Sequence, residues 1–338
     1  MIITGWDIGG AHIKVAKINF EKNKIITKQI YSPVWKNVNN LYKSIKKVNQ
    51  KIGHCNYHSI TMTAELSDIF LNRKKVTDHI VNLCYKIFGK KKIYFYNKKK
   101  FLKKKEALNY SKSLSSLNWH ASANLISNYL SNCILVDIGS TTTDIITIKN
   151  NKVNTKGKSD CQRLKSKELL YIGVLRTPLF AIERKKNLIF ENFSDLSDIY
   201  RILKKIPKKF DTTPTNDNKG KDKHSSARRV ARVFGDDYKK KNFSKWKNFS
   251  IKIKKKQEKI LKENINNIKK KNFSKNVPVI GAGIGEFLLK KIYKNKNYSS
   301  FYKKINYLKK NTINCEAAIS SAILLNNFLK EKWLKFWN

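Results

Sequence analysis

The chain has 338 residues, 41% of them hydrophobic, and a formal net charge of +48. Its length and apolar content suffice for two medium domains with real cores. No apolar run approaches the ~20 residues that a membrane span requires, and no signal peptide precedes the first predicted strand, so we expect a soluble cytoplasmic protein with no membrane partner.

The positive charge is weak evidence about binding partners. It comes overwhelmingly from lysines that are spread along the chain and inflated together with asparagine and isoleucine, as in an AT-rich coding sequence. Such charge runs usually only solvate a surface. We therefore expect small-molecule substrates and no specific nucleic acid, with a homo-oligomer left open. Five cysteines without C-x-x-C spacing argue against a zinc site or a disulfide framework and for a reducing compartment.

The first third of the chain predicts an α/β unit. Alternating and β-branched residues predict strands, turn residues separate them, and a longer periodic segment predicts a helix. In chain order the expected elements are strands 2–7, 13–19 and 24–31, helix 39–51, and an apolar run ending at 61–66.

The pattern partly restarts after Cys133. A strand leads into Asp137, a hairpin follows, and a second strand is expected over 145–148 before a turn at Asn150-Asn151. This repetition predicts two similar halves. Later expectations are a mobile basic insertion around 208–250 that carries one short helix, an amphipathic helix over 251–268, a buried strand turning through glycines into helix 286–293, and a buried helix over 315–325.

Two Asp-Gly loops are the most informative motifs. They read Asp7-Ile8-Gly9-Gly10 and Asp137-Ile138-Gly139-Ser140, each after strand-forming residues. Glycine lets backbone N–H groups approach anionic oxygens, hydroxyl groups add donors, and the two aspartates can hold a hard cation such as Mg²⁺. One such loop is an ordinary turn, but two loops facing one another would form a phosphate cradle.

Several acidic and basic residues have both a functional and a structural interpretation. Glu65 and Asp68 lie where a strand meets a helix, so each could act on a substrate or stabilise the helix start. His120 could be a base or a packed core residue. Lys14 could reach a phosphate as a point charge or be one more exposed strand lysine.

The arginines stand out in a chain rich in lysine. Arg176 precedes Thr177-Pro178 and is suited to bidentate binding of phosphate or carboxylate. Arg228 and Arg232 share a helical face, as do Arg229 and Arg232, so they could bind diphosphate or only solvate the helix.

Three glycine signals resemble the two phosphate motifs and the adenosine-side motif of the actin, chaperone and sugar-kinase superfamily. They are Asp7 to Gly10, Asp137 to Thr142 and Gly281-Ala282-Gly283. Within it the chain resembles the hydantoinase A/oxoprolinase branch, and most of all its methanofuran-pathway synthases and their bacterial relatives in tetrahydromethanopterin-linked C1 transfer. The segments that carry the closer likeness are 5–11, 61–66, 118–121, 135–144, 173–178 and 227–235.

The resemblance implies an α/β fold with two actin-like (RNase H-like) domains, mixed sheets and an inter-domain phosphate cleft. The first domain would cover 1–131 and be completed by a C-terminal helix at 312–338, and the second would cover 132–311. Two residues depart from the family pattern: Asn218 stands where glycine is expected, which asparagine tolerates at positive φ, and Glu316 replaces a proline at the start of the last helix.

The resemblance also implies a reaction. An (aminomethyl)furanylmethyl diphosphate would condense with gamma-glutamyltyramine, forming an aryl ether and releasing diphosphate, with Mg²⁺ as cofactor. ATP is not expected to be required, because no obvious polar group for a ribose follows Gly285. Alternatives are an ATP-dependent small-molecule kinase, a hydantoinase/oxoprolinase-type hydrolase, and a basic nucleic-acid-binding protein.

The predicted site residues fall into four groups. They are catalytic Glu65, Asp144 and His120; diphosphate-binding Gly9, Gly10, Lys14, Gly139, Ser140, Thr141, Thr142, Arg176, Arg229 and Arg232; adenosine-side Gly281, Gly283 and Gly285; and metal ligands Asp7 and Asp137.

Overall fold

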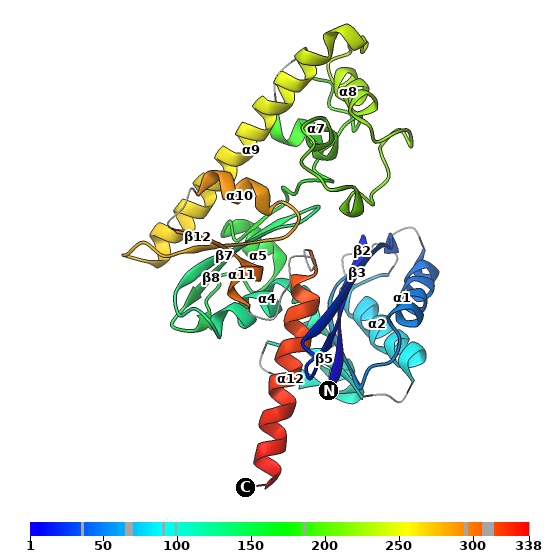
Figure 1. The fold of residues 1–338 in the computed structure, drawn as a ribbon, viewed down its shortest axis with the longest axis vertical. Coiled ribbons are helices and arrows are strands. Elements are labelled where there is room, and N and C mark those ends of the chain that lie inside the picture. Colours follow the sequence, from blue (N-terminus) through cyan, green and yellow to red (C-terminus); the bar gives the residue numbers. More distant parts are fainter. Residues whose placement is uncertain are drawn as a thin grey trace. The chain divides into compact units, whose positions relative to one another are not determined.

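The computed structural model describes residues 1–34, 37–64, 70–89, 92–98, 100–184, 187–293, 297–305 and 314–337. The chain divides into two compact units (Figure 1). The first comprises Met1–Ser131, Ile148–Val153 and Phe301–Asn338, and the second comprises Asn132–Thr147 and Asn154–Ser300.

The first unit is built on a mixed six-stranded sheet in the order β3-β2-β1-β4-β5-β6. Its strands are β1 (Ile2–Gly9), β2 (His12–Asn19), β3 (Lys24–Tyr31), β4 (Tyr57–Thr63), β5 (Lys92–Tyr96) and β6 (Phe101–Leu102). Its helices are α1 (Val38–Ile52), α2 (Arg73–Phe88), α3 (Lys104–Asn109), η2 (Ser111–Leu114), α4 (Asn118–Ser127), α11 (Phe301–Lys304) and α12 (Glu316–Trp337). Strand β1 is antiparallel to β2 and parallel to β4.

Strand β1 is buried on both faces, which explains its nearly continuous apolar sequence. Trp6 and Ile8 join one core with Leu41 of α1 and Ile80 of α2. Gly5 points to the opposite face because side chains alternate along a strand. There α12, red in Figure 1, lies so close that a Cβ on Gly5 would stand 1.8 Å from the Ala318 carbonyl oxygen.

The second unit contains a sheet in the order β10-β8-β7-β11-β12, with β9 paired to β8. Its elements are β7 (Cys133–Ile138), β8 (Thr143–Lys149), β9 (Lys152–Val153), β10 (Leu169–Leu170), β11 (Val279–Ala282), β12 (Tyr298–Ser300), α5 (Asp160–Lys165), α6 (Leu179–Ile182), α7 (Leu196–Ile202), η3 (Lys208–Phe210), α8 (Lys223–Arg232), η4 (Lys240–Asn242), α9 (Phe243–Asn272) and α10 (Glu286–Ile292). Strand β11 is parallel to β7 and β12, whereas β10 is antiparallel to β8.

The two sheets repeat one plan. In each, a strand–hairpin–strand segment supplies two neighbouring strands, a third strand extends the sheet on one side, and two later strands parallel to one another extend it on the other. In the first sheet the short antiparallel strand β6 follows β5 at that side. This confirms the predicted α/β class with two actin-like halves and mixed sheets. Among the described residues, no helix is both long and apolar enough to span a membrane.

The basic segment around 208–250 contains more helix than expected. It includes η3, α8, η4 and the first turns of α9, which begins at Phe243 and not near 251. The Asp222 side chain caps α8 by accepting hydrogen bonds from the N–H groups of His224 and Ser225. Trp246 and Ile253 are buried one heptad apart, so the apolar stripe of α9 begins before its lysine run. Asn218 has φ +54°, as expected for an asparagine at a glycine position.

We predict that Gly5→Ala destabilises the first unit by at least about 1–3 kcal/mol, because the clash is with helix backbone that cannot rotate away. Gly10→Ala is the matched control, since a Cβ on Gly10 would meet no atom within 4 Å. Denaturant midpoints of the two variants measure the difference. Equal midpoints would show that α12 does not pack against Gly5 as described.

Candidate functional site

The first unit places Asp7 near the end of β1, on the same sheet face as Gly5. Asp7 is buried, with 4% of its surface exposed. Lys14 lies directly opposite Asp7 in the register of β2, and Thr61 of β4 lies on the other side. Directly opposite residues of paired strands project to one face. The structure therefore brings together a carboxylate and an ammonium group that sequence reasoning had assigned to phosphate and metal binding.

The start of α12 lies close to these two charges. Lys14 Nζ donates to Asn314 Oδ1 at 3.3 Å, and the Asn314 amide donates to Gln29 Oε1. Burial raises the pKa of the neighbouring Cys315 thiol to about 12, with the positive charge of Lys14 opposing the rise and the negative charge of Asp7 adding to it. Asp7, Lys14 and the first residues of α12 thus form one polar cluster.

The glycine turn after Asp7 is tight on one side and open on the other. A Cβ on Gly9 would lie 2.8 Å from the His12 carbonyl oxygen, so the position accepts only glycine without a backbone shift. A Cβ on the next residue, Gly10, would meet no atom within 4 Å. The Gly10 carbonyl accepts from the Val34 N–H at 2.9 Å. This arrangement leaves room beside a fixed turn for a group bound to the backbone.

In the second unit, the glycine turn after β11 packs directly on the end of β7. Gly283 has φ +80°, and a Cβ there would stand 2.4 Å from both Asp137 Oδ1 and the Ile138 carbonyl oxygen. The Gly285 N–H donates to that same carbonyl at 2.9 Å. Gly283 and Gly285, predicted as adenosine-side residues, therefore also set the position of Asp137.

The loop after Asp137 is held by the segment 173–176. The N–H groups of Leu175 and Arg176 both donate to the Ser140 carbonyl, at 3.0 and 2.9 Å. Gly173 lies so close that a Cβ would be 2.5 Å from the Ser140 backbone. Arg176 Nη1 lies 3.5 Å from Thr141 Oγ1. Two segments far apart in sequence, both predicted to bind diphosphate, therefore form one loop cluster with Gly139 and Thr142.

Asp144 and His120, both predicted to be catalytic, have side-chain partners. Asp144 forms an ion pair with Arg163 at 2.8 Å, and that guanidinium is almost fully buried. His120 Nδ1 is hydrogen-bonded to the Tyr96 hydroxyl at 2.8 Å and packs edge-on against Trp119. These contacts supply structural roles, while the catalytic roles stay predictions. Glu65 and Asp68 lie outside the described residues.

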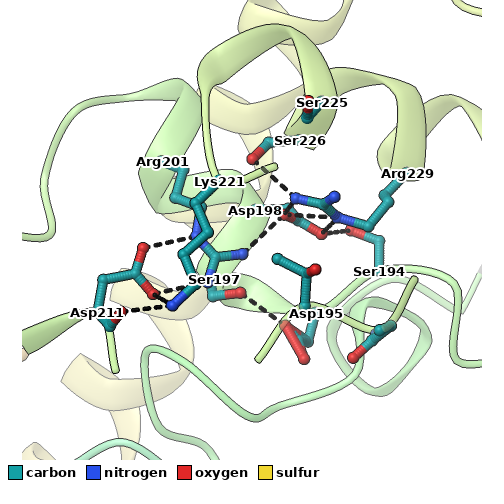
Figure 2. Close-up of polar contacts among 12 residues, drawn as sticks. Ser194, Asp195, Ser197, Asp198, Arg201, Asp211, Lys221, Ser225, Ser226 and Arg229 are labelled. Atoms are coloured by element: carbon teal, nitrogen blue, oxygen red, sulfur yellow. Dashed lines mark hydrogen bonds and ion pairs between the residues drawn. The ribbon is translucent and has the colours of Figure 1, made fainter. Parts of the chain in front are cut away.

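Arg229 belongs to a buried ion-pair network (Figure 2). Its guanidinium donates to Asp198 through Nε and Nη2, the latter at 2.7 Å, and to Asp217 through Nη1 at 2.9 Å. Arg201 pairs with Asp198 at 3.0 Å and with Asp211 at 2.6 Å. Arg232 is exposed. The structure therefore gives Arg229 carboxylate partners of its own chain, while its predicted role in diphosphate binding stays untested.

Asp195 is a residue that sequence reasoning missed. It is 9% exposed, and burial, followed by the nearby negative charge of Asp198, raises its pKa to about 7. Ser197 Oγ donates to Asp195 Oδ1 at 2.9 Å. Within the described chain no arginine or lysine forms an ion pair with it. The run Ser194-Asp195-Leu196-Ser197-Asp198 gave no signal, because only the three-dimensional placement of the arginines gives Asp198 the ion pairs and leaves Asp195 without one among the described residues.

Sequence comparisons identify relatives along most of the chain. Residues 56–188 match the Hydantoinase/oxoprolinase family model. The chain is 35% identical over 298 residues to the (4-{4-[2-(gamma-L-glutamylamino)ethyl]phenoxymethyl}furan-2-yl)methanamine synthase of Methanocaldococcus jannaschii, covering 86% of this chain and 88% of that protein. It is 34% identical over 212 residues to the synthase of that name from Methanococcus vannielii, covering 60% and 94%. The predicted resemblance is confirmed.

Solved structures with similar folds are much more distant in sequence. A ROK family glucokinase from Streptomyces griseus in complex with glucose and AMPPNP is 12% identical, covers 96% of this chain and 99% of that chain, and has a TM-score of 0.48. An activator of the 2-hydroxyisocaproyl-CoA dehydratase from Clostridium difficile with bound ADPNP is 11% identical, covers 99% and 98%, and has a TM-score of 0.43. The strand order of the two sheets, and not these overall similarities, establishes the fold.

We predict that Arg229→Met lowers the free energy of unfolding by about 3 kcal/mol, because it removes a buried partner of Asp198. The exposed Arg232→Met should change it by less than about 0.5 kcal/mol. Guanidinium titrations of the two variants give both values. If Arg229→Met were as stable as Arg232→Met but bound diphosphate more weakly, Arg229 would be a ligand-binding residue and not a structural one.

Proposed function

We propose that this chain, which belongs to the family of the (4-{4-[2-(gamma-L-glutamylamino)ethyl]phenoxymethyl}furan-2-yl)methanamine synthases, makes the aryl ether that this product name describes. The identity of 35% over 298 residues carries the proposal. Both relatives are named synthases, so the chain is an enzyme. Its product would serve methanofuran biosynthesis in C1 metabolism.

The reaction that we propose is a substitution at a furanylmethyl carbon. The phenol oxygen of gamma-glutamyltyramine forms a bond to the methylene carbon of an (aminomethyl)furanylmethyl diphosphate. The bond from that carbon to the diphosphate oxygen breaks, and the phenolic proton passes to a base. Diphosphate leaves readily once its charge is neutralised, so the protein must mainly position the two substrates and stabilise developing charge.

The loop cluster of the second unit suits the diphosphate group. The N–H groups of Leu175 and Arg176 donate to the Ser140 carbonyl. Ser140 and Thr141 lie in the loop between β7 and β8, and within the described residues their N–H groups donate to no backbone carbonyl. These donors are therefore available to an anion. Arg176 beside Thr141 adds a fixed positive charge. We propose that this cluster, with Gly139 and Thr142, binds the diphosphate.

Mg²⁺ fits the donor chemistry of the two Asp-Gly loops. The described residues contain no group of three or more His, Cys, Asp or Glu side chains arranged to hold a metal ion. A Mg²⁺ that takes one or two carboxylates and otherwise phosphate oxygens and water needs no such group. We propose Asp7 and Asp137 as the carboxylate ligands, and bound Mg²⁺ would supply neutralisation of the leaving group. ATP is not required in this proposal.

A second candidate is an ATP-dependent reaction of the hydantoinase/oxoprolinase type, or a small-molecule kinase. The family-model match over residues 56–188 favours it. The two candidates differ in whether ATP is consumed, which a single assay can decide.

We predict that the purified chain forms the ether from the furanylmethyl diphosphate and gamma-glutamyltyramine with Mg²⁺ and without ATP. Mass spectrometry would detect the ether, and a phosphate assay would detect one diphosphate per ether. Diphosphate release should depend on the phenolic partner. Strict dependence on ATP with stoichiometric ADP would instead establish the second candidate.

We predict that Asp7→Asn and Asp137→Asn each lower kcat/KM by at least ~10²-fold, because each removes a charged oxygen ligand of the cation. Asp236→Asn is the matched control, since that exposed carboxylate pairs only with Lys245 among the described residues. Rates across a Mg²⁺ titration, with melting temperatures as a check of folding, measure the effect. A wild-type rate at limiting Mg²⁺ in either variant would remove that residue from the metal site.

A further inference from the structure

Asp195 is tied to the loop cluster of the second unit through backbone hydrogen bonds. Pro178 and Asp195 form an isolated β-bridge, and the Leu196 N–H donates to the Thr177 carbonyl at 2.9 Å. The same segment, one residue earlier, donates from Arg176 to Ser140. A short run of backbone thus connects Asp195 to the loop that we propose to bind diphosphate.

The neighbouring arginines form ion pairs with carboxylates other than Asp195. Asp198 pairs with both Arg229 and Arg201, and Arg201 also pairs with Asp211. In Figure 2 the dashed line that reaches the Asp195 carboxylate comes from Ser197. Asp195 is therefore an acidic group beside a second carboxylate, and its nearest cations are committed to that second carboxylate. Burial and Asp198 together raise its pKa to about 7, so it can exchange a proton near neutral pH.

Aromatic residues flank the bridged pair Pro178 and Asp195 in the sequence of both segments. Phe193 precedes it by two residues and is 37% exposed, and Phe180 follows Pro178 by two residues. The Phe180 ring packs edge-on against Phe190, with centroids 6.2 Å apart, and Phe190 is 58% exposed. Exposed aromatic rings on the segments that carry a partly protonated carboxyl group can offer an apolar surface with one polar contact, which is what a phenol needs.

We propose that Asp195 is the base that accepts the phenolic proton, with the ring of the phenolic substrate held against Phe180, Phe190 and Phe193. This inference rests on the proposed ether synthesis and adds the nucleophile's subsite to it. The phenolic O–H bond breaks toward an Asp195 carboxylate oxygen as the new O–C bond forms, and the C–O bond to diphosphate breaks with its electron pair leaving on diphosphate. Atoms and charge balance without any further reactant.

The test compares Asp195→Asn with the exposed control Asp236→Asn. In the wild type, kcat should rise with pH through a midpoint near 7, because the base works only when it is deprotonated. Asp195→Asn should lower kcat by ~10²- to 10⁴-fold, abolish that acidic limb, and leave diphosphate binding within twofold of the wild type. Asp236→Asn should change none of these.

A more acidic phenol separates a base from a merely structural residue. With a ring-difluorinated gamma-glutamyltyramine, which is largely ionised at pH 8, the defect of Asp195→Asn should shrink by at least tenfold. An equal defect with both phenols would overturn the assignment, as would an Asp195→Asn variant with the wild-type rate and pH profile.

Failure of the inference is distinguishable from failure of the proposed function. If the wild type makes no ether from the furanylmethyl diphosphate, the function itself fails. Folding is checked independently: the folded state holds the Asp195 proton more tightly than the unfolded state, so the contribution of Asp195 to stability falls as pH rises from about 4 to about 7. Asp195→Asn removes this loss and should melt no lower than the wild type at pH 8.

Discussion

The close approach of backbone to backbone around the end of β7 is the constraint on which the second unit depends. Gly283 lies against Asp137 and Ile138, and Gly173 lies against Ser140, at separations where a Cβ would stand 2.4–2.5 Å from its neighbours. Only glycine permits such contacts. Because the turn after β11 and the segment 173–176 both close on this one strand end, the loop after Asp137 is fixed from two sides.

In the first unit a glycine also permits a close backbone contact, here between a strand and a helix. Gly5 brings the backbone of α12 onto the central strand, and this places the start of that helix next to Asp7 and Lys14. Asn314 then accepts a hydrogen bond from Lys14, and the charges of Lys14 and Asp7 act on the neighbouring Cys315 thiol. The residues that lead into the C-terminal helix thereby contribute to a cluster whose other members, Asp7 and Lys14, come from β1 and β2.

Charge is distributed in two ways in this molecule. Most lysines solvate the surface, whereas the arginines Arg163, Arg201 and Arg229 are buried and pair with carboxylates. A planar guanidinium can satisfy two carboxylates at once, which an ammonium group does less well. The pairing leaves Asp195 without a cation of its own, and a buried carboxyl in that position retains its proton to near neutral pH. The network that stabilises α7 and α8 therefore also sets the chemistry of its neighbour.

The sequence by itself determined the order of the elements, because hydrophobic periodicity and turn residues act locally. The strand Lys24–Tyr31 could be predicted in this way, as could the repeat of strand, Asp-Gly loop and strand. The turn at Asn150-Asn151, where both asparagines have positive φ, could be predicted as well. The family was readable too, since its motifs are contiguous. Tertiary structure alone decided that Asp144 pairs with Arg163 and that Arg229 pairs with Asp198. It also decided that Asp195 stays without an ion pair, because a charge's partner depends on residues tens of positions away, whose side chains meet only after the sheets and helices have packed.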